Sequence, residues 1–329
     1  MMQLDVPLWT SAELRAGCGI ASARPWYADR LDIAGQKVMP GTLYVALGHG
    51  DDVLDVSEAL SRGAIAALVD NRQAGLGGDD PRLVHVDNTE TVLRQMAVKA
   101  RDRAPATRVA VLGDMRGAVT AILAQVFGLD VEVQAADEGL APSVRIALAL
   151  ARLERSARYG LFDLEADADL IGLIAPHVVL VGAGGVQGVD GLLSALPKEA
   201  VLVVDITDKA AASFARRAVE DGRQVMTVSM TRKAAVRPAK IIEHSHCTCL
   251  SADIDGVPVT YKVGIAGADW VALSLMILAA VKAADADLGR AALCLAGLGS
   301  ALNDDMEESD WAEGPDASQW ATARRALAE

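Results

Sequence analysis

The sequence contains no lysine between Lys99 and Lys198, few aromatic residues and no long hydrophobic run. Aromatic residues make up 4% of the 329 residues, so the core has to be built mainly from aliphatic side chains. The longest apolar stretch, residues 270–281, is too short to span a bilayer. The N-terminal residues lack the basic region and apolar run of a signal peptide. We therefore expect a cytoplasmic protein with no membrane insertion.

Positive charge is also scarce. The formal net charge is −13, which argues against a nucleic-acid partner, because nucleic-acid affinity depends on neutralising phosphates. The four cysteines are scattered along the chain and indicate reduced thiols rather than a disulfide framework. They are Cys18, Cys247, Cys249 and Cys294.

The order of predicted elements indicates an α/β protein with two domains. Residues 1–104 alternate short strands and helices, beginning with a capping box over residues 10–13, and form a small N-terminal α/β domain. Residues 105–302 alternate strand and helix again, which predicts a mostly parallel, doubly wound sheet. Two strands, 240–250 and 257–264, add a β-hairpin to it. Residues 303–329 form an acidic tail.

A glycine-containing turn between a strand and a helix is the most informative motif. It consists of Gly113, Asp114, Met115, Arg116, Gly117 and Ala118. This layout binds nucleotide phosphates when it reads G-x-x-x-x-G-K-[ST], because lysine adds charge and the hydroxyl holds Mg²⁺. Here Gly117 is followed by Ala118 and Val119, which supply neither group. Arg116 is an alternative phosphate contact, but Asp114 beside it would repel an anion, and we favour a solvent-facing arginine.

Two further motifs have simpler explanations. In the segment 244–249, His244 and His246 would point to one face of a strand, and Cys247 and Cys249 to the other. We therefore predict a half-buried strand and no metal site. The glycine-rich segment 182–188 has the form of a dinucleotide turn, with Asp205 about twenty residues further on. A shortened loop explains those glycines equally well, and we predict no cofactor.

Several segments resemble the Mur ligase family over about residues 8–302. Residues 37–48 match its P-G-x-L-F-x-A stretch and residues 59–69 its A-x-x-x-G-A-x-A-x-x-V stretch, and the hairpin is followed by a helix at 269–284. Mur ligases are ATP-dependent enzymes that join amino acids or dipeptides to UDP-N-acetylmuramic acid. The MurF-like type, which adds D-alanyl-D-alanine, is the most similar. The resemblance implies a UDP-sugar-type first domain and a P-loop-NTPase-like central domain.

The chain departs from that family at several functional positions. The D-[ST]-R element of the family's sugar site is replaced by Ala34-Gly35-Gln36 here. Gly35, Gln36 and His49 would be the remnant of that site. For His49 we favour the interpretation that it lies in a surface loop. Asp163 takes the place of a metal-binding glutamate. Asp269-Trp270 replaces a His-Asn pair.

Two larger losses complete these departures. The resemblance implies that the segment with a carbamoylated lysine is deleted and that the family's C-terminal domain is absent. The lysine gap therefore covers two lost functions of the family, the phosphate lysine and the carbamoylated lysine.

These departures predict a catalytically inactive Mur ligase homologue that acts as a binding, scaffold or regulatory protein. A protein partner, self-association or a cell-wall precursor would be its target. Trp311 and Trp320 are the candidate partner contacts, because solvated acidic tails seldom carry tryptophan. Two alternatives stay open: a divergent ATP-dependent amide ligase completed by a partner subunit, and a small-molecule or nucleotide sensor that uses residues 182–188.

Overall fold

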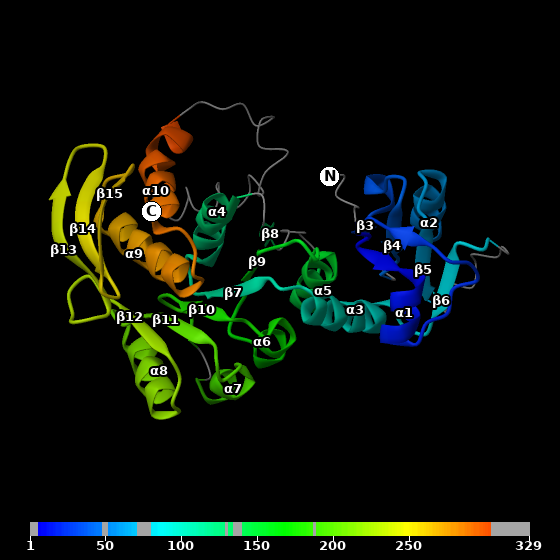
Figure 1. The fold of residues 1–329 in the computed structure, drawn as a ribbon, viewed down its shortest axis with the longest axis horizontal. Helices are drawn as coiled ribbons and strands as arrows, with labels where there is room; N and C mark the ends of the chain where they lie inside the picture. The colour runs from blue at the N-terminus through cyan, green and yellow to red at the C-terminus, as the bar shows by residue number, and fades with distance from the viewer. Residues whose placement is uncertain are drawn as a thin grey trace. The chain divides into compact units, whose positions relative to one another are not determined.

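A computed structural model describes residues 6–47, 52–70, 80–128, 131–133, 140–186 and 189–303. Contacts within the chain group it into two compact units, residues 1–106 with 137–157 and residues 107–136 with 158–329 (Figure 1). No helix within the described ranges combines the length and the hydropathy needed to cross a bilayer. The two units are described separately below.

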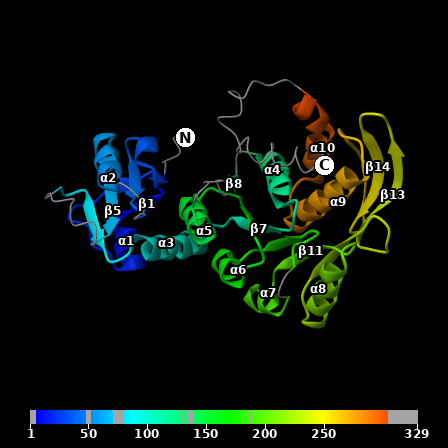
Figure 2. The same cartoon turned by 180° about the vertical axis from the view of Figure 1, so that it is seen from behind.

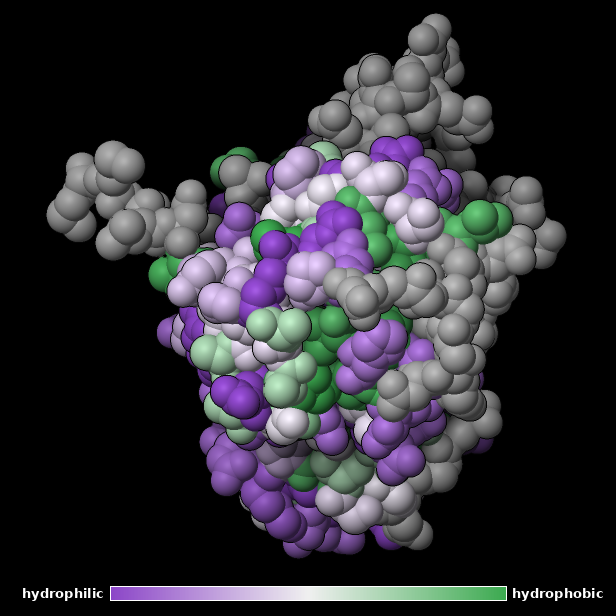
Figure 3. All heavy atoms as spheres, turned by 90° about the vertical axis from the view of Figure 1, so that its right-hand side faces the viewer, coloured by the Kyte–Doolittle hydropathy of each residue, from purple (hydrophilic) through white to green (hydrophobic). Residues whose placement is uncertain are grey.

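The first unit is built on a four-stranded parallel sheet in the order β3-β4-β5-β6. Its strands are β3 (Arg30–Asp32), β4 (Thr42–Val45), β5 (Ala66–Asp70) and β6 (Leu83–Val86), with a separate pair formed by β1 (Trp9–Thr10) and β2 (Tyr27–Ala28). Its helices are α1 (Ser11–Cys18), η1 (Gly35–Lys37), α2 (Asp52–Ser61), α3 (Thr89–Arg103) and α5 (Pro142–Arg152). Figure 3 shows one face of this unit, on which hydrophilic and hydrophobic residues are interspersed. Helix α5 packs against α3, although it follows the first strand of the second unit in the sequence.

Helix α1 begins with the predicted capping box. Thr10 accepts a hydrogen bond from the amide of Glu13, and Glu13 Oε2 accepts one from the amide of Thr10, each at 3.1 Å. The other carboxylate oxygen of Glu13 contacts the guanidinium groups of Arg103 and Arg155. Arg103 lies over the ring of Trp9, 4.1 Å from its centroid, and Trp9 donates to the carbonyl of Ala151 at 2.8 Å. We call five of these residues the Glu13 cluster: Trp9, Thr10, Glu13, Arg103 and Arg155.

The second unit contains a nine-stranded sheet in the order β15-β14-β13-β12-β11-β10-β7-β9-β8. Its parallel strands are β7 (Thr107–Leu112), β8 (Val131–Val133), β9 (Tyr159–Asp163), β10 (Val178–Val181), β11 (Val201–Asp205) and β12 (Val225–Val228). Strand β13 (Val236–Glu243) is parallel to β12, and β14 (Thr248–Ile254) and β15 (Val257–Val263) continue the sheet antiparallel. The prediction of a large, mostly parallel sheet in an α/β protein is therefore confirmed.

Helices cover both faces of this sheet (Figures 1 and 2). Helices α4 (Arg116–Phe127), α9 (Ala268–Ala283) and α10 (Leu288–Asn303) lie on one face, and α6 (Ala168–Ile174), α7 (Val189–Ala195) and α8 (Lys209–Glu220) on the other. Helix α9 is apolar on nearly all sides, which is typical of a helix enclosed by other elements. It packs against β10, β11 and α4 and forms the centre of the main core cluster.

The structure corrects two sequence-based expectations in this unit. Residues 240–250 form parts of two strands, because the chain turns between Glu243 and Thr248, where the amide of His244 donates to the carbonyl of Cys247 at 2.9 Å. The antiparallel part therefore has three strands rather than a single hairpin. Helix α6 was not predicted, although Asp167 before it accepts hydrogen bonds from the amides of Asp169 and Leu170 and so caps it.

Candidate functional site

The candidate site lies at the carboxyl ends of β7 and β10. These strands are hydrogen-bonded neighbours, but the chain leaves β7 toward β8 and leaves β10 toward β11, on opposite sides of the pair. Connections that diverge in this way create a topological switch point, the place where open α/β sheets bind ligands. The two glycine-containing segments singled out in the sequence, 113–118 and 182–186, are the segments that follow these two strands.

The two segments are hydrogen-bonded to each other. The amide of Asp114 donates to the carbonyl of Ala183 at 2.9 Å, and the amide of Gly182 donates to the carbonyl of Leu112 at 3.0 Å. Gly113 has φ +121°, and a Cβ placed on it would lie 2.8 Å from the Ala183 carbonyl oxygen. The close approach therefore requires glycine at this position.

Amide groups in the turn also donate within the turn itself. The amide of Arg116 donates to the carbonyl of Gly113 at 3.2 Å, and the amide of Val119 to the carbonyl of Met115 at 3.1 Å. A phosphate-binding loop uses such backbone N–H groups to hold the anion. In this turn the amides of Asp114 and Arg116 already have protein acceptors, and the Val119 amide makes the first hydrogen bond of helix α4.

The remaining predicted loop residues lie around the start of α4. Gly117 and Ala118 are in its first turn, and Ala118 is buried. The Asp163 carboxylate, at the end of β9, lies 4.0 Å from the position that a Cβ on Gly117 would take. The structure thus brings the proposed metal position and the glycine turn together, as the resemblance implies.

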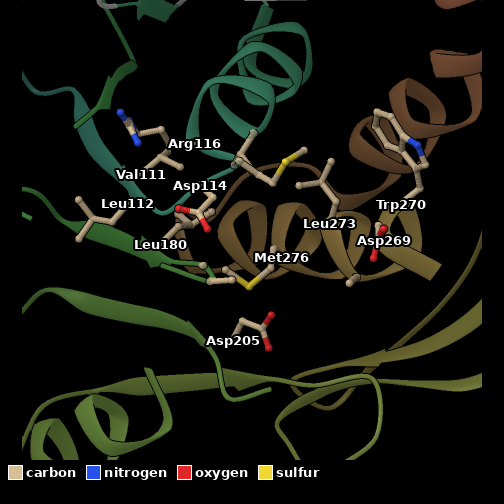
Figure 4. Close-up of a pocket in the computed structure, with 15 residues that line it drawn as sticks. Val111, Leu112, Asp114, Arg116, Leu180, Asp205, Asp269, Trp270, Leu273 and Met276 are labelled. Carbon is tan, nitrogen blue, oxygen red and sulfur yellow. The ribbon is translucent and has the colours of Figure 1, made fainter. Parts of the chain in front are cut away.

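A pocket of about 270 Å³ opens beside the turn. Strands β7 and β10 and helices α4 and α9 supply a mostly apolar lining (Figure 4). The larger apolar side chains in it are Val111, Leu112, Met115, Val119, Leu180, Trp270, Leu273 and Met276. Its volume lies just below the roughly 300–1,000 Å³ that is usual for ligand pockets, so it suits a small molecule.

Three carboxylates lie around this pocket: Asp114 after β7, Asp205 at the end of β11, and Asp269 in the first turn of α9. We call them the pocket aspartates. Asp205 accepts a hydrogen bond from the amide of Thr207 at 2.8 Å, and Asp114 and Asp269 are exposed. The sequence singled out each of these positions for a different reason, and the fold places them around one cavity.

Among the described residues that line the pocket, Arg116 is the one basic residue. Its guanidinium lies 3.6 Å from the Glu165 carboxylate, donates to the carbonyl of Gly113 at 3.3 Å, and points away from Asp205 and Asp269 (Figure 4). Three carboxylates against one guanidinium give the lining a formal charge of −2 (1 − 3). A polyphosphate would meet repulsion here, whereas a cation would be attracted.

The other predicted site residues lie elsewhere or outside the described ranges. A Cβ on Gly35 would collide with the backbone carbonyl of Asp55 in α2, so this glycine permits close packing, and Gln36 is exposed. His49, Trp311 and Trp320 lie outside the described residues. His244, His246 and Cys247 lie at the turn between β13 and β14, and within the described ranges no three His, Cys, Asp or Glu side chains gather closely enough to hold a metal ion.

Comparison with known proteins gives a structural likeness only. No protein-family model matches the sequence, and no curated protein matches it by sequence. MurF from Acinetobacter baumannii has a TM-score of 0.68 with this chain at 16% identity, covering 88% of this chain and 68% of that one. The MurF ligase from Thermotoga maritima, solved in complex with ADP, has a TM-score of 0.61 at 16% identity, covering 80% and 65%.

A third solved structure is more distant. A pseudomurein peptide ligase type C from Methanothermus fervidus has a TM-score of 0.51 at 12% identity, covering 78% of this chain and 65% of that one. This chain therefore spans about two thirds of the length of these ligases. At such low identity the comparison establishes a shared fold, and the chemistry has to be argued from the site itself.

Proposed function

We propose that this chain is a relative of the Mur ligases that does not carry out ATP-dependent ligation and acts as a binding protein. The glycine turn 113–118 follows β7 at the switch point of the sheet, a position where open α/β sheets bind ligands, and this supports the proposal. The observation that carries the proposal is the chemistry of that turn. The amides of Asp114 and Arg116 donate to protein carbonyls, and among the described residues that line the adjoining pocket carboxylates outnumber cations.

The physical argument concerns transition-state charge. Phosphoryl transfer depends on positioning and on neutralising negative charge, and one missing donor costs about 3–4 kcal/mol of transition-state stabilisation. Ala118 and Val119 provide neither the lysine nor the hydroxyl, and Asp114 adds negative charge. Several such deficits acting on one step would bring the rate near the uncatalysed one.

The first test is a calorimetric titration with ATP and Mg²⁺, with the Thermotoga maritima ligase as the positive control. We expect no saturable heat from this chain at millimolar nucleotide. A loop-restored double variant, Ala118→Lys with Val119→Thr, is expected to remain silent as well, because the Asp114 amide still donates to Ala183 and the pocket aspartates remain. Micromolar ATP binding by the unaltered chain, or ligation at ordinary enzyme rates, would refute the proposal.

The binding target is the second part of the proposal. We propose a protein partner, a second copy of the chain or a cell-wall precursor, with Trp311 and Trp320 as contacts to a protein partner. Affinity capture with the full chain and with the variant Trp311→Ala/Trp320→Ala tests the tryptophans, with Trp26→Phe as a control for tryptophan loss elsewhere. Capture of the same proteins in the same amounts by both would exclude these two tryptophans as contacts.

A further inference from the structure

The pocket aspartates line a cavity that the proposed function leaves without a ligand. We infer that this pocket binds a small organic cation, an ammonium group carried on a compact apolar body. The inference rests on the proposed function, because a pocket that bound ATP would not also be proposed as a binding site for an organic cation. The inference assigns to the cavity a class of ligand, an organic cation, that the resemblance to nucleotide-dependent ligases would not suggest.

The charge of the lining is the first support. Asp114, Asp205 and Asp269 approach the cavity from three different elements, so a bound cation would be attracted from several sides. Arg116 contributes little opposing charge at the centre, because its guanidinium pairs with Glu165 and points away from Asp205 and Asp269. An anion would face the same carboxylates, and the described lining residues include no lysine.

The apolar part of the lining is the second support. Val111, Leu112 and Leu180 are almost fully buried, and Met276 and Trp270 are less than a tenth exposed. An apolar wall lowers the local dielectric constant and so strengthens the attraction between a carboxylate and a cation. It also favours a ligand that buries carbon atoms, because each buried CH₂ group is worth about 0.8 kcal/mol.

The spacing of the carboxylates favours an organic cation over a metal ion. Hard divalent cations require about six oxygen ligands at roughly 2.0–2.6 Å. Within the described residues, no three His, Cys, Asp or Glu side chains converge in a way that could hold a metal ion, and the pocket aspartates are among those residues. An ammonium group on a carbon skeleton can instead be stabilised by carboxylates placed around the cavity mouth.

The size of the cavity limits the ligand. About 270 Å³ is below the usual range for drug-sized ligands, so a single-ring or short branched amine suits the cavity. Phenethylammonium is therefore a suitable probe. Its neutral isostere 2-phenylethanol and its anionic counterpart 3-phenylpropionate keep the apolar body and change only the charge.

The experiment titrates these three probes, Mg²⁺ alone, and ATP with Mg²⁺ into the full chain, followed by calorimetry and ligand-observed NMR. We expect saturable binding of the amine, with the neutral isostere at least roughly tenfold weaker, because a charge-assisted hydrogen bond is worth that much. Equal binding of the amine and the neutral isostere, binding of Mg²⁺ alone, or no amine binding would each overturn the inference.

Variants separate the pocket aspartates from general surface charge. Asp205→Asn and Asp269→Asn are each expected to weaken amine binding by roughly threefold to tenfold, and the double variant by more. Glu199→Gln removes the same charge from an exposed turn outside the pocket and is expected to leave amine binding unchanged. Circular dichroism confirms that each variant is folded, and equal weakening by Glu199→Gln would overturn the inference.

The ATP titration separates this inference from the proposed function. ATP binding by the unaltered chain contradicts the proposed function whatever the amine does. Absence of both ATP and amine binding leaves the proposed function standing and overturns the cation site.

Discussion

The Glu13 cluster of the first unit and the pocket aspartates of the second use charge in opposite ways. In the first, one carboxylate caps a helix and contacts two arginines, one of which lies over a buried tryptophan. In the second, three carboxylates share the lining of a cavity with one arginine that pairs outside it. The charges of the cluster are used by the fold, whereas those of the pocket remain available to a ligand.

This difference separates structural charge from functional charge. When charges are buried or half-buried, removing one partner of a pair is strongly destabilising, because it leaves the other charge uncompensated. Burial lowers the pKa of Arg103, the charge of Glu13 opposes that shift, and the neighbouring charge of Arg155 adds to it. Like charges placed together destabilise a fold unless a ligand neutralises them, so an unbalanced group at a switch point indicates binding.

The largest effect is expected for Trp9→Ala in the Glu13 cluster. Trp9 is 1% exposed and carries both the Arg103 contact and the hydrogen bond to Ala151. Its removal should lower the free energy of unfolding by about 3–5 kcal/mol, measured by urea denaturation. Trp9→Phe keeps most of the ring and should cost less, so equal losses for the two variants would contradict this account.

The next effect is expected at Gly113, where the two loops of the site touch. Gly113→Ala would force a Cβ against the Ala183 carbonyl in a backbone region that favours glycine, and should cost about 2–4 kcal/mol. Gly222→Ala is the matched control, because it also has positive φ but no atom within 4 Å of the added Cβ. It should cost about 1–2 kcal/mol. Equal unfolding midpoints would exclude the close approach as the cause.

Glu13→Gln tests the balance of charge directly. Glutamine can still form the capping box, so the loss reports the pairing with Arg103, whose side chain is 12% exposed, and with Arg155. We expect about 1–2 kcal/mol, between the values for exposed and buried pairs. Glu58→Gln removes the exposed pair with Arg62 in the same unit and should cost about 0.3–0.5 kcal/mol. A larger loss in the free energy of unfolding for Glu58→Gln than for Glu13→Gln would contradict the claim that the Glu13 pairs contribute more than the exposed pair.

A smaller effect is expected at Tyr261 in the core of the second unit. Its hydroxyl is 2.8 Å from that of Ser274, which donates to the carbonyl of Val271, so Tyr261→Phe should cost about 1 kcal/mol.

Burial also raises the pKa of the Tyr261 phenol. In the unfolded chain this group loses its proton near pH 10, while the folded state still retains it. Wild-type stability should therefore decline above about pH 10, because the unfolded state then binds fewer protons. Tyr261→Phe should show a shallower decline in denaturation curves recorded from pH 8 to pH 11; parallel curves would contradict this.

The smallest effect on stability is expected for Asp269→Asn in the pocket. The variant loses a favourable interaction with the start of α9 but also relieves repulsion from the other pocket aspartates. The net change should stay within about 0.5 kcal/mol, measured by urea denaturation. A loss above about 2 kcal/mol would mean that Asp269 is structural, as Glu13 is.

Local signals in the sequence predicted many elements correctly. The capping box at Thr10 and Glu13, strand β15 and helix α9 lie where the sequence indicated, because each depends on neighbouring residues. The turn between Glu243 and Thr248 was not found, since the polar residues 244–249 are compatible with either a strand or a turn. The position of α5 beside α3 was also not foreseeable, because it depends on contacts such as Trp9 with Ala151, which are far apart in the sequence.

The sequence by itself determined the α/β class, the mostly parallel sheet and the missing lysine and hydroxyl after Gly117, because these depend on periodicity and on residue identity. The tertiary structure decided that the turn at Gly113 hydrogen-bonds to the loop after β10, and that Asp114, Asp205 and Asp269 surround one apolar cavity. These residues are separated by tens of positions in the chain. The chain proceeds from β7 and from β10 toward opposite edges of the sheet, and this topology brings the ends of the strands and the start of α9 together.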